Sequence, residues 1–167
     1  VWDTPFQVPP FAKITAADFA PALDIAMQDD LAKIDAIAQN PEPATFANTI
    51  EALETTSELM HKVLSPFYAM AGAHTNPELD ALMREFSPKL AAHGAKISGN
   101  EALFQRIETL WNSKDTLELS EEQMMLLKDQ YRGFVRSGAA LTGKAEARLT
   151  EIKSRLSVLC TTFTQNV

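Results

Sequence analysis

A chain of 167 residues with 46% hydrophobic and 22% charged residues has the size and composition of one globular domain. Its 15 Lys and Arg are scattered singly among 22 Asp and Glu, and this net charge of −7 argues against nucleic-acid or anionic membrane partners. No apolar run approaches the roughly 20 residues that span a bilayer, and the single Cys160 cannot form an internal disulfide or a thiolate metal site, so we expect a cytoplasmic protein.

The first 14 residues predict an irregular arm rich in proline and aromatic residues, because proline removes backbone donors and fixes an extended path. We expect Trp2, Phe6 and Phe11 to anchor this arm to a larger body. Thr15 and Asp18 then resemble a capping box, which predicts that a helix begins there. Apolar residues follow at helical spacing, namely Phe19, Leu23, Met27, Leu31, Ile34 and Ala38. The Asn-Pro-Glu-Pro run at 40–43 ends this helix.

Two long helices are predicted next. The apolar positions of the first are Phe46, Ile50, Leu53, Met60, Leu64 and Phe67. This helix is expected to extend to Ala73, with Ser57 in the gap of the series and a kink or local break at Pro66. The second begins at Asn76-Pro77, a capping residue followed by proline at the first helical position, and runs to Gly99 with a bend predicted at Pro88.

Three further helices complete the predicted bundle. A short one covers Leu103–Trp111, and Ser120 with Gln123 forms a capping box that opens another, which ends near Gly138. The apolar positions of the last are Leu141, Ala145, Leu149, Ile152, Leu156, Leu159 and Phe163. This uninterrupted series predicts that the last helix organises the core, so Leu156→Ala should be far more destabilising than Lys153→Ala. No segment alternates with period two. The sequence therefore predicts an all-α bundle of about six amphipathic helices, forming a single domain over residues 1–167.

The three histidines are the first candidates for chemistry. Glu58 and His61 lie one turn apart, but a di-iron bundle needs this pair twice, together with two further Glu residues, and the sequence has only one such pair. His93 lies on an apolar stripe, which predicts a buried, hydrogen-bonded imidazole that is neutral near pH 7. His74 follows the second predicted helix, where a cation near the C-terminus is favoured by the helix dipole. None of the three is expected to bind a metal.

Other candidate features also have structural interpretations. Neighbouring acids such as Asp29-Asp30 and Glu121-Glu122 point in different directions on a helix, so we expect solvated surface charge or charge in the first turn of a helix. The glycines mostly punctuate helices and form no phosphate-binding loop, and no Gly-x-Ser-x-Gly nucleophile motif occurs. The methionines and Cys160 fall on or beside apolar stripes and are expected to fill the core. The residues therefore predict no catalytic, cofactor-binding or metal-binding site in this chain.

Several short segments of the sequence resemble segments of one enzyme family and occur in the same order as in that family. They lie at residues 2–6, 9–11, 19–23, 37–41, 45–54, 73–76, 134–139 and 163–166. In them the chain resembles bacterial peptidyl-dipeptidases, which share a family of zinc peptidases with oligopeptidase A and thimet oligopeptidase. The segment at 45–54 is the most specific, and the resemblance covers essentially the whole chain.

The resemblance implies a long, mostly helical enzyme with two lobes and a deep channel between them. In this family the two His of a His-Glu-x-x-His helix and a later Glu hold zinc, and the Glu of the motif assists the attacking water. Here the histidines are followed by Lys62, Thr75 and Gly94, so no His-Glu pair exists. The resemblance thus places the catalytic lobe beyond Val167 and assigns no zinc ligand or catalytic residue to this chain.

The expected function is therefore that of a non-catalytic, channel-forming N-terminal domain in a zinc metallopeptidase. We expect a peptidyl-dipeptidase that removes C-terminal dipeptides from short peptides, with zinc bound by the parent enzyme and no cofactor in this chain. Its partners would be the catalytic domain and short peptide substrates. Two alternatives remain, an N-terminal domain of an oligopeptidase A-like endopeptidase and a stand-alone helical interaction module.

Overall fold

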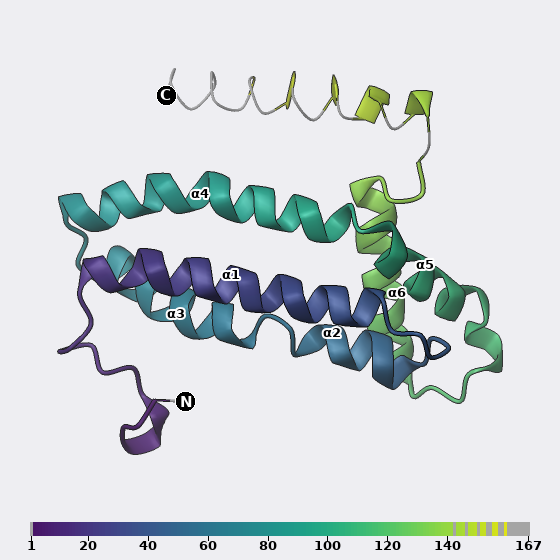
Figure 1. The fold of residues 1–167 in the computed structure, drawn as a ribbon, viewed down its shortest axis with the longest axis horizontal. Helices are drawn as coiled ribbons and strands as arrows, with labels where there is room; N and C mark the ends of the chain where they lie inside the picture. Colours follow the sequence, from purple (N-terminus) through teal and green to yellow (C-terminus); the bar gives the residue numbers. More distant parts are fainter. Residues whose placement is uncertain are drawn as a thin grey trace.

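The computed structural model describes residues 2–141, 143–145, 147–149, 151–152, 155–156 and 159. Within this part of the chain all regular structure is helical, which confirms the predicted all-α class. Three long helices run alongside one another, and two more lie at one end of them (Figure 1). The six α-helices of the described residues are α1 (Ala16–Ala38), α2 (Ala52–Glu54), α3 (Glu58–Ala73), α4 (Pro77–Ser98), α5 (Glu101–Asn112) and α6 (Glu121–Ser137).

The helix starts follow the predicted capping residues. The Asn76 side chain accepts a hydrogen bond from the Leu79 N–H at 2.9 Å, and Ser120 with Gln123 forms the reciprocal capping box. At the start of α1, the Asp18 carboxylate accepts hydrogen bonds from the N–H and the hydroxyl of Thr15, which hold the pKa of Asp18 below its usual value. Because the pKa is lowered in the folded state, this cap contributes stability above the unfolded pKa and loses it as the pH falls through the folded pKa.

The second predicted helix is divided, and the break does not lie at Pro66. A π-helix, η2 (Phe46–Glu51), leads into the short α2, and a turn at 55–57 separates α2 from α3. In this turn the hydroxyls of Thr55 and Thr56 donate to the carbonyls of Ala52 and Leu53, and such bonds compete with helical hydrogen bonds. α3 continues through the buried Pro66, so the helix is not broken there, and the alternative of a kink at Pro66 stays a prediction. α4 likewise continues through Pro88.

The linker between α1 and η2 is held by one arginine on α5. Arg106 donates through Nη1 to the carbonyls of Asn40 and Glu42, at 2.9 and 3.0 Å, and through Nη2 to the Asn48 side chain at 2.9 Å. The same Asn48 oxygen accepts the N–H of Thr45 and so caps η2. A single guanidinium therefore fixes a proline-rich segment that has little regular hydrogen bonding of its own.

Two apolar clusters make the core, and α1 belongs to both. The cluster nearer the start of α1 joins it to α3 and α4, and its buried members are Phe19, Leu23, Phe67, Leu79 and Phe86. The other cluster joins the end of α1 to η2, α5 and α6, and its buried members are Ile34, Ile37, Phe46, Ile50, Leu103, Phe104, Ile107, Leu110, Leu127 and Phe134. The helix that connects the core is therefore α1.

The prediction that the last helix organises the core was wrong. Ile152, Leu156 and Leu159 are 48%, 58% and 55% exposed, and the buried members of both clusters come from earlier helices. The physical reason is that an apolar stripe stabilises a fold only where another element covers it, and the described bundle already packs α1 against its neighbours. Leu156→Ala is thus no longer expected to be costly. Lys153 and Phe163 lie outside the described residues.

The N-terminal arm is anchored at fewer points than predicted. Trp2 is half-buried and lines a hollow with Ile14, Phe19 and Pro66. Phe6, however, is 98% exposed and anchors nothing, and Phe11 is exposed as well. The density of aromatic residues and prolines indicated contact, but only the side-chain directions decide which rings reach the body.

Two glycines of α6 should respond oppositely to alanine. Gly133 lies inside the helix, and no atom lies within 4 Å of the position that an added methyl group would take, so Gly133→Ala should stabilise the fold by about 0.5–1 kcal/mol. Gly138 ends the helix with φ of 97°, where a side chain is strained, so Gly138→Ala should destabilise it by about 1–2 kcal/mol. Urea unfolding of both variants checks this pair, and equal shifts would contradict the assigned helix end.

Candidate functional site

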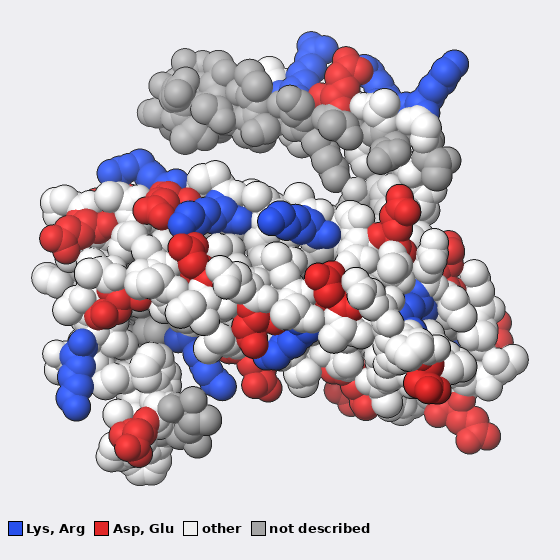
Figure 2. All heavy atoms as spheres, in the orientation of Figure 1, with Lys and Arg blue, Asp and Glu red and all other residues white. Residues whose placement is uncertain are grey.

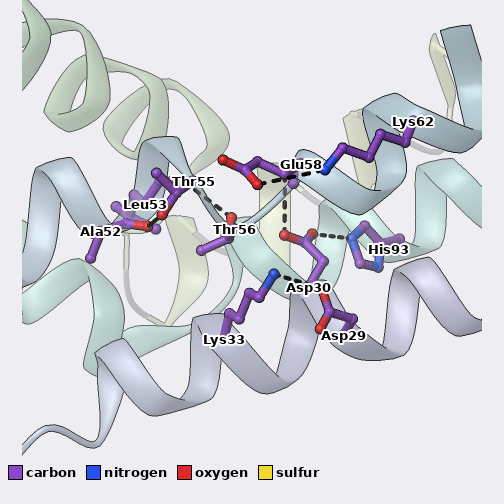
Figure 3. Close-up of polar contacts among 11 residues, drawn as sticks. Asp29, Asp30, Lys33, Ala52, Leu53, Thr55, Thr56, Glu58, Lys62 and His93 are labelled. Atoms are coloured by element: carbon purple, nitrogen blue, oxygen red, sulfur yellow. Dashed lines mark hydrogen bonds and ion pairs between the residues drawn. The ribbon is translucent and has the colours of Figure 1, made fainter. Parts of the chain in front are cut away.

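The most buried polar cluster described in the chain joins Asp30, Ser57 and His93. Asp30 lies on α1 and His93 lies on α4 (Figure 3), and Ser57 directly precedes α3. The His93 Nε2 atom is 2.6 Å from one carboxylate oxygen of Asp30, and the Ser57 hydroxyl donates to the other at 3.1 Å. Asp30 is 1% exposed and His93 is 6% exposed. The cluster therefore connects three helical elements through one buried carboxylate.

The chemistry of this cluster differs from that of a catalytic triad, although the residue types are the same. In a triad the imidazole stands between the hydroxyl and the carboxylate and takes the hydroxyl proton. Here the carboxylate stands in the middle: Ser57 donates to Asp30, and the His93 ring contacts the other carboxylate oxygen and not the hydroxyl. What the arrangement provides is hydrogen bonding for a buried carboxylate and a buried imidazole.

The sequence predicted one of these residues correctly and misjudged another. His93 is buried, as predicted, while its neutral state stays a prediction. Asp30 was expected on the solvated surface with Asp29, which is wrong: Asp30 is four residues from both Ala26 and Ile34, on the buried face of α1. This spacing was the available signal. Asp29 instead pairs with Lys33 at 2.7 Å, and that hydrogen bond raises the pKa of Lys33.

The Glu58 and His61 pair forms no metal site with other described residues. Glu58 contacts Lys62 at 4.0 Å, and the exposed His61 lines a shallow hollow beside Trp2. Across the described ranges, no three His, Cys, Asp or Glu side chains gather closely enough to hold a metal. Cys160 lies outside those ranges, so the predicted absence of a metal site stays a prediction.

His74 stands at the C-terminal cap of α3, the position that the sequence predicted for it. Its N–H donates to the Met70 carbonyl at 2.9 Å, and its side chain is exposed. Nothing among the described residues places it near His61 or His93 as part of one site.

A groove between α1 and α4 lies beside the buried cluster and is lined by several charged side chains. Lys89 forms hydrogen bonds with Glu85 at 2.9 Å and Asp24 at 3.1 Å, and these raise its pKa. His93 and Lys96 also line the groove. Positive and negative side chains are interspersed on the face seen in Figure 2, without a continuous basic band. This arrangement lacks the basic stripe that nucleic-acid binding requires.

None of the described helices combines the length and the hydropathy needed to cross a membrane. The candidate features are thus an internally paired polar cluster, a charged groove and a hollow beneath the arm. In the first two, the charged side chains of Asp30 and Lys89 bind partners within the chain.

The sequence of this chain is similar to those of several known peptidases. No family model matches the chain. It is 37% identical over 163 residues to dipeptidyl carboxypeptidase of Escherichia coli and 36% identical to that of Salmonella typhimurium, matches that cover 98% of this chain. It is 26% identical to oligopeptidase A of Escherichia coli over 98% of this chain. The chain spans about a quarter of the length of these relatives, 24% in each case. Over almost its whole length the chain therefore matches the N-terminal part of dipeptidyl carboxypeptidase and oligopeptidase A, which are longer proteins.

Proposed function

We propose that this chain is the N-terminal helical domain of a cytoplasmic zinc peptidase that removes C-terminal dipeptides from short peptides. The observation that carries the proposal is the 37% identity to dipeptidyl carboxypeptidase over nearly the whole chain. In this proposal the domain forms part of the wall of a channel that admits short, unfolded peptides. In this proposal the catalytic residues lie in the part of the enzyme that corresponds to the unmatched three quarters of the relatives.

The described residues of this chain do not fit a zinc site, so the proposal places no catalytic step on them. None of the three histidines is followed by Glu, and His61, His74 and His93 do not share a cluster with other described ligand types. In this proposal the polar residues of the chain make the domain rigid. The Asp30–His93 pair and the Arg106 contacts fix helices and a linker, which suits a wall that holds its shape while peptides pass.

An exchange of domains tests the proposal. The matching N-terminal part of Escherichia coli dipeptidyl carboxypeptidase is replaced by this chain, and the release of dipeptides from a short peptide is measured. Because a misplaced active site loses about 100-fold in rate, we expect the chimera to stay within about 100-fold of the parent enzyme. The 167-residue chain alone should hydrolyse no peptide. A folded chimera as inactive as the enzyme without this part would contradict the proposal.

The runner-up is the N-terminal domain of an endopeptidase like oligopeptidase A, to which the chain is 26% identical. The same exchange into Escherichia coli oligopeptidase A separates the two functions. The proposal expects the dipeptidyl carboxypeptidase chimera to recover more of its parent's activity, and the opposite order would favour the endopeptidase.

A further inference from the structure

The segment that follows α6 carries apolar side chains that the bundle does not use. α6 ends at Gly138 in the left-handed conformation, and the described residues from 144 to 159 are helical. Ile152, Leu156 and Leu159 are each about half exposed or more. In Figure 1 the described turns of this segment lie outside the layer of long helices. The chain therefore presents an apolar surface after its core is complete.

These three side chains share one face of the helix. Steps of four and three residues return to the same side after one turn, so Ile152, Leu156 and Leu159 form a continuous strip, here called the C-terminal strip. Among the described residues, the two core clusters and the side chains packed against them extend no further than Ala139. Large aliphatic side chains grouped in this way usually mark a surface that another element covers.

We propose that the C-terminal strip is a docking surface for the polypeptide that the longer relatives carry beyond this region. The inference rests on the proposed function and names the surface through which the domain meets the rest of the enzyme. The match covers only 24% of the Escherichia coli relative, so about three quarters of such a protein remains to supply a cover. Helically spaced aliphatic side chains fit the groove between the ridges of a second apolar helix. A segment tethered in the same chain reaches them at high effective concentration.

The test compares Leu156→Glu with Ala147→Glu, which introduces the same side chain. Ala147 is exposed and lies nine residues before Leu156, roughly two and a half turns away and thus on the opposite side of the helix. In the isolated 167-residue chain, both variants should keep the melting temperature within about 2 °C of the unchanged protein, because both sites are exposed. In the dipeptidyl carboxypeptidase chimera, Leu156→Glu should reduce the yield of active enzyme at least about tenfold, since it buries a charge, while Ala147→Glu should not.

Each other outcome overturns the inference in a recognisable way. An active chimera that tolerates Leu156→Glu leaves the proposed function standing and removes the docking surface. If the chimera with the unchanged strip is inactive, both the proposed function and the proposed partner of the strip are contradicted. Unfolding of the isolated chain by Leu156→Glu would show that the strip belongs to the bundle. A dimer of the isolated chain that Leu156→Glu abolishes would identify a second copy as the occupant.

Discussion

Asp30→Ala is expected to lower the free energy of unfolding by about 2–4 kcal/mol, because it leaves the buried His93 ring and the Ser57 hydroxyl without their hydrogen-bond partner. Asp30 is 1% exposed and contacts both His93 and Ser57, so its loss affects α1, α4 and the start of α3 together. Stability is measured by guanidinium unfolding, monitored by helical circular dichroism. A cost of this size is a large share of the roughly 5–15 kcal/mol that holds a domain together.

Asp29→Ala is the matched control for this experiment. Asp29 is the neighbouring residue, but its side chain and that of its partner Lys33 are partly exposed, at 36% and 45%, so its loss should cost no more than about 1 kcal/mol. The double change Asp30→Leu with His93→Leu should cost less than the two single changes combined, because it removes both polar partners at once. Equal costs for Asp29→Ala and Asp30→Ala would contradict the buried pair.

Phe67→Ala is expected to cost about 3–5 kcal/mol through lost burial and the cavity left behind. Phe67 is fully buried, and its ring lies 5.2 Å from that of Phe19 and 4.8 Å from that of Phe86, measured between centroids. It therefore joins α3 to both α1 and α4. The measurement is again denaturant unfolding at constant pH.

Phe6→Ala provides a control with the same chemical change. Phe6 is 98% exposed, so its removal should alter the free energy of unfolding by no more than about 0.5 kcal/mol. If Phe6→Ala costs as much as Phe67→Ala, the arm is packed on the body and the assigned core is wrong.

Local signals in the sequence predicted much of the fold. The caps at Asn76 and Ser120 and the predicted helices that correspond to α1, α4, α5 and α6 were confirmed, because capping and helical periodicity depend on residues close in sequence. The turn at 55–57 was missed because an apolar stripe continues on either side of it. Only the gap at Ser57 indicated that the helical register changes there.

Features that depend on distant contacts could not be predicted in this way. The spacing of Asp30 from Ala26 and Ile34 indicates its buried side of α1, but its partner His93 lies 63 residues away on α4, and nothing local to Asp30 identifies that partner. The last stripe had the most regular spacing, but periodicity shows only that one side of a helix is apolar, not which element covers it. The residues of the candidate site could be predicted only in part for the same reason. Histidine spacing argued against a zinc motif, whereas the polar cluster emerged only once three helices were brought together.

The place of α1 in both clusters has a consequence for how the bundle opens. If α1 leaves one of the two clusters, the other cluster is weakened as well. Release of the helix exposes apolar surface in both clusters, near its start and near its end. A partly opened state with one end of α1 released therefore loses apolar burial in both clusters. The chain entropy that this state gains is small by comparison. The described bundle is therefore built to unfold as one cooperative unit, and the amide protons of α1 should exchange with solvent last.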